Sequence, residues 1–154
     1  MGVLYLDTSA AVKRYVAESG SAWITAQSDP AAGNSCRIAA LTRVELVAAL
    51  YRRVRTCTLT LTQAQLAEQL FRHELSTHYR RVPIRDAILD RAMRLVVSYS
   101  LRAYDALQLA SALHVRDSLQ THRLQPPIFI SADQILNQAA LAEGLPVEDP
   151  NQHP

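Results

Sequence analysis

The sequence is poor in glycine, and the few glycines it has are scattered along the chain. Its 154 residues include four, namely Gly2, Gly20, Gly33 and Gly144. A phosphate-binding P-loop, a dinucleotide-binding GxGxxG turn and the GxSxG turn of serine hydrolases all need clustered glycines, which permit tight turns and close approach of the backbone. The sequence therefore excludes all three motifs.

Motifs built on cysteine or histidine are missing as well. The two cysteines, Cys36 and Cys57, form neither a disulfide framework nor a CxxC pair. The five histidines contain no HExxH motif and no other i, i+4 pair, so a histidine-rich zinc site is not indicated. Lys13 is the single lysine against 15 arginines. If the protein performs chemistry, we expect carboxylates to carry it.

Long apolar runs are absent too, which excludes a membrane-spanning helix, since one needs about 18 or more consecutive apolar residues. Residues 1–7 lack the basic region and long apolar stretch of a signal peptide, so we expect a cytoplasmic protein. The composition, 49% hydrophobic and 19% charged, is typical of one globular domain. The net charge of only +2 means that a nucleic acid would have to contact a local basic patch.

Short apolar runs alternate with amphipathic segments. We expect strands at 3–6, 36–40, 79–84 and 128–130, and helices at 10–17, 21–27, 42–55, 62–78, 85–99, 105–119 and 131–143. Pro83 cannot donate to a central ladder, which places the third strand at an edge, and Thr62 is expected to cap its helix. The alternation predicts an α/β domain over 1–148 with a mostly parallel sheet, followed by a disordered tail at 149–154.

Three acidic residues fall where a predicted strand gives way to a helix: Asp7, Glu45 and Asp133. A fourth, Asp105, opens a helix without an identifiable strand before it. Because the carboxyl ends of parallel strands meet at one edge of a sheet, we expect the first three to lie together. Each alone has a simpler interpretation as a helix cap, and Glu45 can pair with Thr42 in a capping box. Capping does not explain why these positions are acidic when Ser, Thr and Asn serve equally well.

Carboxylates gathered in one cleft repel one another, and the repulsion raises their pKa values. A divalent cation removes the repulsion, and oxygen ligands without histidine or thiolate suit Mg²⁺ or Mn²⁺. Such an ion can activate a water molecule and bind a phosphate oxygen. The pattern therefore predicts metal-assisted hydrolysis of a phosphodiester.

Four segments, taken in order, resemble the successive motifs of PIN-domain ribonucleases, and most closely those of the VapC-type toxins of bacterial toxin–antitoxin pairs. The segments are LYLDTSA at 4–10, TRVEL at 42–46, AYDALQLA at 103–110 and ISAD at 130–133. The resemblance runs from Val3 to about Val147. It implies a three-layer α/β/α sandwich with a central, mostly parallel sheet of four or five strands, and an endoribonuclease that depends on Mg²⁺ or Mn²⁺.

Matched position by position, the resemblance assigns the metal-binding and catalytic acids to Asp7, Glu45, Asp105 and Asp133. Ser9 and Ser131 match positions at which the family often has a small hydroxyl residue. Residues 132–137 follow the last motif only loosely. Members of the family are commonly homodimers, and a small antitoxin commonly inserts a segment near the acidic site.

An acidic pocket repels RNA, so we expect cations beside it. The candidates are Lys13, Arg14, Arg43, Arg52, Arg53, Arg55, Arg80 and Arg81, although a solvated helix face is the simpler interpretation of each. Tyr104 is placed to stack on a base, against the ordinary alternative of buried packing. Two other functions stay open: a PIN ribonuclease of RNA processing that is not a toxin, and a PIN-like module that binds RNA or a partner without cutting it.

Overall fold

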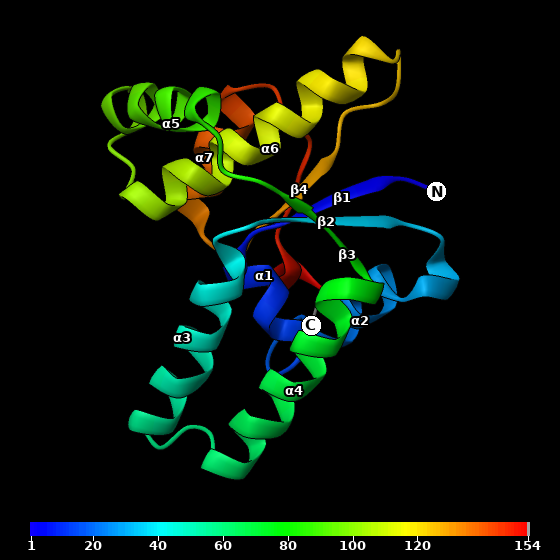
Figure 1. Ribbon diagram of the computed structural model, residues 1–154, viewed down its shortest axis with the longest axis vertical. Helices are drawn as coiled ribbons and strands as arrows, with labels where there is room; N and C mark the ends of the chain where they lie inside the picture. Colours follow the sequence, from blue (N-terminus) through cyan, green and yellow to red (C-terminus); the bar gives the residue numbers. More distant parts are fainter. Residues whose placement is uncertain (154) are drawn as a thin grey trace.

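The computed structural model describes residues 1–153, and its strands form one sheet. They are β1 (Val3–Leu6), β2 (Ser35–Ala39), β3 (Tyr79–Val82), β4 (Ile128–Ile130) and β5 (Val147–Glu148). The order across the sheet is β3-β2-β1-β4-β5, and every neighbouring pair is parallel (Figure 1). The predicted parallel sheet is confirmed, with β3 at an edge; the strand ends at Val82, so Pro83 lies just outside it. The short β5 was not predicted, because its two residues carry no apolar run.

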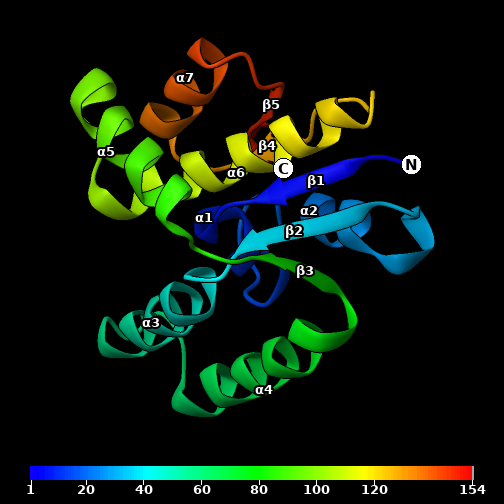
Figure 2. The same ribbon diagram turned by 45° about the horizontal axis from the view of Figure 1, so that its top comes forward.

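The helices cover both faces of the sheet (Figures 1 and 2). One layer contains α1 (Thr8–Ala11), η1 (Val12–Arg14), α2 (Ser21–Ser28), η2 (Pro30–Ala32), α3 (Thr42–Arg55) and α4 (Leu61–Thr77), and the other contains α5 (Asp86–Tyr99), α6 (Ala103–Thr121) and α7 (Gln134–Ala142). This arrangement confirms the three-layer α/β/α architecture. None of the helices described within residues 1–153 combines the length and apolarity needed to cross a membrane.

The central strand β1 is buried on both faces, and its side chains alternate between two hydrophobic cores. Leu4 and Leu6 belong to the core beneath α1–α4. Tyr5 belongs to the core beneath α5–α7, where its ring stacks on Phe129 at a centroid distance of 5.7 Å. This is why the run at 3–6 is continuously apolar: a strand covered on both sides has no solvent face.

The connections out of β1 and β4 run in opposite directions. From β1 the chain passes through α1 and α2 on one face to β2, whereas from β4 it passes through α7 on the other face to β5. Ligands of open parallel sheets bind at such a switch point, beyond the carboxyl ends of the strands. The backbone N–H of Asp7, directly after β1, donates to the carbonyl of Ile130 in β4 over 3.1 Å, so the two exits are fixed together.

Two predicted helix caps are wrong. Leu41, not Thr42, is the N-cap of α3, because the Thr42 hydroxyl lies in the core and accepts a hydrogen bond from Gln108 over 3.0 Å. Thr60, not Thr62, caps α4, and it forms a capping box with Gln63. The Thr42 prediction fails because a tertiary contact with Gln108 uses its hydroxyl. The Thr62 prediction fails because another threonine, two residues earlier, caps the helix.

The predicted disordered tail is corrected for residues 149–153. Pro150–Gln152 form the short helix η3, whose cap Asp149 accepts from the backbone of Asn151. Pro150 is buried, and the ring of His153 stacks on Trp23 of α2 at 4.3 Å. Contacts with α2 thus hold a segment that has no periodic pattern of its own; Pro154 lies outside the described residues.

Gly20 is expected to be essential for seating η3 on the fold. Its φ is +82°, and a Cβ there would clash with the backbone carbonyl of Pro150. Gly144 has φ +83° but nothing within 4 Å, so it is a matched control. Gly144→Ala should cost about 1–2 kcal/mol of unfolding free energy, and Gly20→Ala roughly 1–3 kcal/mol more. Urea unfolding measures both, and equal losses would contradict the close approach of η3.

Candidate functional site

A cavity of about 750 Å³ opens at the carboxyl end of β1. All four predicted acids line it, together with four cationic side chains; the acids are Asp7, Glu45, Asp105 and Asp133, and the cations are Lys13, Arg52, Arg53 and Arg102. Asp7 lies between β1 and α1, Glu45 in α3, Asp105 in α6, and Asp133 between β4 and α7. The fold therefore brings to one cavity carboxylates that are widely separated along the chain.

Asp7 is both a helix cap and the most buried acid of the cavity. Its Oδ1 accepts from the backbone N–H of Ala10 over 3.0 Å and from the Ser9 hydroxyl over 2.7 Å, and its Oδ2 accepts from the Ser131 hydroxyl over 3.0 Å. Burial raises the pKa of Asp7 to about 6. The three donors act in the opposite direction, and the negative charge of Glu45 adds to the rise.

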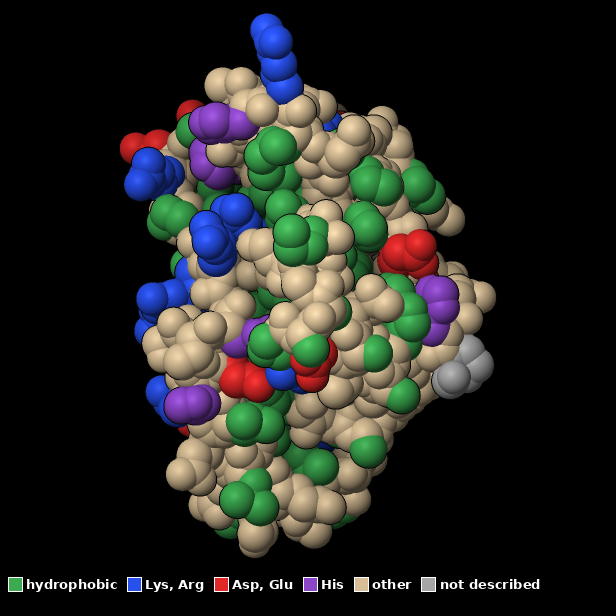
Figure 3. All heavy atoms as spheres, turned by 90° about the vertical axis from the view of Figure 1, so that its right-hand side faces the viewer, with side chains coloured by type: hydrophobic (Ala, Val, Ile, Leu, Met, Phe, Trp, Pro, Cys, Tyr) green, Lys and Arg blue, Asp and Glu red, His purple; other side chains and the backbone are tan. Residues whose placement is uncertain are grey.

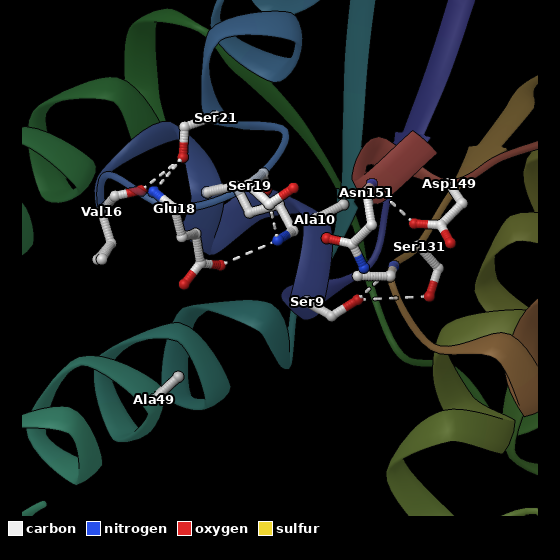
Figure 4. A network of polar contacts seen from close by, with 12 residues as sticks. Ser9, Ala10, Val16, Glu18, Ser19, Ser21, Ala49, Ser131, Asp149 and Asn151 are labelled. Atoms are coloured by element: carbon white, nitrogen blue, oxygen red, sulfur yellow. Dashed lines mark hydrogen bonds and ion pairs between the residues drawn. The ribbon is translucent and has the colours of Figure 1, made fainter. Parts of the chain in front are cut away.

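Ser9 and Ser131, the two predicted hydroxyl residues, join the exits of β1 and β4. The Ser9 oxygen accepts from the backbone N–H of Ala132 over 2.8 Å, and the Ser131 oxygen accepts from that of Asp133 over 3.0 Å. Figure 4 shows the two serine side chains directed toward each other. Asp133 in turn caps α7 by accepting from Leu136. The carboxylates of Asp7 and Asp133 are thus held at fixed positions by a shared set of hydrogen bonds.

Glu45 lies in the first turn of α3, and one of its oxygens is held from behind. Its Oε2 accepts from the Thr8 hydroxyl and from the Gln108 amide, each over 2.7 Å. Burial raises the pKa of Glu45, these two donors lower it, and the charge of Asp105 raises it further. The carboxylate is therefore fixed in a partly desolvated position beside a second negative charge.

Asp105 completes the electrostatic connection between the acids. It occupies the first turn of α6, and burial followed by the charge of Asp133 raises its pKa, while Arg102 acts to lower it. Glu45 thus acts on Asp7, Asp105 on Glu45, and Asp133 on Asp105. These acids therefore interact electrostatically across the one cavity that they line.

The donors of the cavity fit a hard divalent cation in kind, because they are carboxylate and hydroxyl oxygens without histidine or cysteine. Within residues 1–153, no three Asp, Glu, His or Cys side chains lie close enough together to form a ready metal site. Mg²⁺ keeps several water molecules and uses few carboxylates, so it does not require a closed cage of acids.

Three of the predicted RNA contacts lie at this cavity: Lys13, Arg52 and Arg53. Lys13 is buried, and its ammonium donates to Glu18 over 3.1 Å and to the carbonyl of Ser19 over 2.9 Å. Arg53 donates to the other oxygen of Glu18 over 2.9 Å. Figure 4 shows Glu18 and Ser19 in the segment between η1 and α2, above α3. Among the described residues, Arg52 has no ion-pair partner, and it is exposed.

The other predicted cations lie elsewhere. Arg14 faces the core, where it donates to both oxygens of Glu74 over 2.9 Å and to the Ser28 hydroxyl. Arg43 lines a second cavity between α3 and α4. The remaining predicted cations line neither cavity; they are Arg55, Arg80 and Arg81. Seen from the side on which β1 begins, Lys and Arg side chains gather along one margin of the surface (Figure 3). Positive charge is therefore not confined to the acidic cavity.

Sequence reasoning missed four polar residues of the site. The cavity is also lined by Thr8, Glu18, Arg102 and Gln108, and none of them was among the candidates. Gln108 lies three residues after Asp105, a spacing that places both on one helical face and that could have identified it. Of the two interpretations of Tyr104, buried packing is excluded, because 63% of its surface is exposed and it lines the cavity.

The chain is similar to known proteins in its sequence and in its fold. A family model described as "PIN domain" matches residues 4–141, while a comparison with curated proteins finds no match. Among solved structures, a toxin–antitoxin complex from Klebsiella pneumoniae aligns with 20% identity and a TM-score of 0.58, covering 96% of this chain and 97% of that one. VapBC2 from Rickettsia felis, bound to a promoter DNA fragment, aligns with 11% identity and a TM-score of 0.62 over 96% and 98%.

A third similar structure is Mycobacterium tuberculosis VapC20, described as a toxin that cleaves the sarcin-ricin loop. It is 16% identical, with a TM-score of 0.60, and the alignment covers 92% of this chain and 95% of that one. At such identities, these structures show a shared fold and nothing finer.

Asp7→Asn should stabilise the metal-free protein at neutral pH, because it removes a buried charge. Since the folded pKa of about 6 exceeds the ordinary value of 3.8, the folded state binds the proton more tightly, and stability falls as the pH rises from about 4 to about 6. The difference corresponds to roughly 3 kcal/mol above that range. Urea unfolding with a chelator, at about pH 4.5 and about pH 7.5, should show a gain and a flatter pH dependence for the variant.

A variant as pH-dependent as the wild type, or less stable at about pH 7.5, would contradict the desolvation of Asp7.

Proposed function

The chain belongs to the PIN domain family, and on that premise we propose that it is an endoribonuclease that hydrolyses RNA phosphodiester bonds with Mg²⁺ or Mn²⁺. One observation carries the proposal: the carboxylates of Asp7, Glu45, Asp105 and Asp133 line a single cavity, and neighbouring acids of this set raise the pKa values of Asp7, Glu45 and Asp105. Helix capping accounts for one acid at a time and gives no reason for four to converge. A cation accounts for all of them together.

Asp7, Glu45 and Asp105 would hold the ion, with Asp133 completing the shell directly or through water. When bound, a divalent cation supplies an activated water and stabilises charge on the phosphate. The residues of the chain contribute orientation. Ser9 and Ser131 hold the carboxylate of Asp7, and Thr8 holds that of Glu45. Neutralising the cluster would also lower the raised pKa values, so that the acids stay ionised at neutral pH.

RNA would approach along the cationic side of the cavity. Lys13, Arg52 and Arg53 lie at this side, and phosphate contacts of this kind position a nucleic acid without reading its sequence. The exposed ring of Tyr104, next to Asp105, is available to stack on an unpaired base. Single-stranded or looped RNA is the substrate that fits both features.

We propose further that the protein is the toxin of a VapBC-type pair, acting in the cytoplasm and inhibited by a small antitoxin. Support comes from the similar structures, of which the one from Klebsiella pneumoniae is described as a toxin–antitoxin complex and VapC20 as a toxin. A homodimer is the proposed assembly, and α5 offers an apolar surface for it, since Met93 and Val97 are 69% and 85% exposed. A PIN ribonuclease of RNA processing would have the same acidic site without an antitoxin.

Removing single carboxylates tests the acidic site. Asp7→Asn, Glu45→Gln and Asp105→Asn should each lower Mn²⁺-stimulated cleavage of a looped RNA by about 100-fold or more, because direct ligands matter at least as much as their outer partners. Asp86→Asn is the control, since Asp86 occupies the first turn of α5 outside the cavity. Cleavage should stop with a chelator and return with Mn²⁺. Wild-type cleavage by the three variants, or cleavage that persists in the chelator, would reject the proposal.

Neutralising one arginine tests the RNA path. Arg52→Gln should weaken binding of RNA to catalytically inactive Asp105→Asn protein and reduce the slope of log affinity against log salt concentration by about 1. Arg55→Gln should leave the slope unchanged, because Arg55 lies on the same helix outside the cavity lining. Titrations at several salt concentrations measure both slopes. Equal effects of the two substitutions would mean that RNA follows another surface.

A further inference from the structure

A buried polar cluster lies behind Glu45, within the hydrophobic interior. We define it as Tyr5, Thr8, Thr42 and Gln108, which we call the Gln108 cluster. The side chains of Tyr5, Thr42 and Gln108 are almost fully buried, with 0%, 0% and 2% of their surfaces exposed. An apolar side chain would suit position 108 of α6 better, since the neighbouring Leu109, Ala110 and Ala112 all pack in the core. A buried amide at this position therefore calls for a specific reason.

The orientation of the Gln108 amide follows from its neighbours. The ionised carboxylate of Glu45 only accepts hydrogen bonds, so the amide nitrogen must face it. That nitrogen lies 2.7 Å from Glu45 Oε2, and 3.0 Å from each of the hydroxyl oxygens of Thr8 and Thr42. The amide oxygen then faces the Tyr5 hydroxyl, which donates to it over 2.9 Å. The hydrogen bond from Tyr5 thus stabilises the orientation in which the amide nitrogen, and not the oxygen, faces Glu45.

The consequence for Glu45 is that its two oxygens have different environments. Oε2 accepts from Thr8 and Gln108, whereas Oε1 has no hydrogen-bond partner within residues 1–153. Because hydrogen bonds to a charged group are stronger than neutral ones, the two donors fix the rotation of the carboxylate. One oxygen is held by the protein, and the other is left to the cavity.

We propose that Gln108, oriented by Tyr5, is a positioning residue that holds Glu45 with one oxygen available to the metal ion. This inference rests on the proposed function, since it gives a role in metal binding to residues that touch neither the ion nor RNA. Outer partners of this kind typically change metal affinity by about 10- to 100-fold when they are removed.

Two substitutions and a control test the inference. Gln108→Met keeps the length of the side chain but removes the donor, and Tyr5→Phe leaves Gln108 in place without the hydroxyl that orients it. Tyr15→Phe is the matched control, because the Tyr15 hydroxyl also takes part in hydrogen bonds inside the protein: it donates to Glu74 and lies 2.9 Å from the hydroxyl of Tyr79, beside the opposite core. Calorimetric titration with Mn²⁺ alone, thermal unfolding, and the dependence of RNA cleavage on Mn²⁺ concentration are measured for each.

Gln108→Met should weaken Mn²⁺ binding by about 10-fold or more, and Tyr5→Phe by a smaller factor of about 2–10. Cleavage by Tyr5→Phe should return toward the wild-type rate at saturating Mn²⁺, with the KM for RNA unchanged, which a merely structural defect would not do. Tyr15→Phe should keep the wild-type Mn²⁺ affinity even where its melting temperature falls. If Gln108→Met does not fold, Tyr5→Phe alone decides.

One contrary result is that the wild-type protein binds Mn²⁺ and cleaves RNA with it while Tyr5→Phe and folded Gln108→Met keep the wild-type Mn²⁺ affinity. That result would overturn this inference and leave the proposed function intact. Wild-type protein that neither binds Mn²⁺ nor cleaves RNA with it would overturn both.

Discussion

The burial of negative charge at the carboxyl edge of the sheet is the constraint on which the rest of the site depends. Asp7 is 4% exposed and follows a strand that is covered on both faces, so its carboxylate loses most of its water. Desolvation and neighbouring carboxylates both disfavour the charged form. Burying this charge lowers the stability of the folded protein, and a cation is the partner that would relieve the cost.

The surroundings of the acids reduce this cost without removing it. The carboxylate oxygens accept hydrogen bonds from uncharged groups. The donors are backbone N–H groups, the amide of Gln108, and the hydroxyls of Ser9, Ser131 and Thr8. These donors are neutral, so they orient the carboxylates and lower their pKa values but leave the negative charge in place. Cationic Lys13 and Arg53 are engaged with Glu18 instead. The acidic cavity therefore stays negative beside a cationic side, which suits a metal ion and a phosphate chain together.

Much of the fold and of the acidic site could be predicted, because both leave local patterns of apolar and acidic residues in the sequence. Apolar runs that end in an acid identified β1 with Asp7 and β4 with Asp133, and the parallel sheet then brought their ends together. Other features depend on contacts between distant segments. Arg14 could not be told from a surface cation until Glu74 of α4 was placed beside it, and the tail became ordered only through its contacts with α2.

The most direct measurement of the central claim is a crystal structure with Mn²⁺, in which anomalous scattering locates the ion without reference to the protein atoms. The account predicts a peak inside the cavity, within coordination distance of carboxylate oxygens of Asp7, Glu45 or Asp105, with water completing the shell. A fully occupied ion elsewhere and none in this cavity, at Mn²⁺ concentrations that support RNA cleavage, would contradict it.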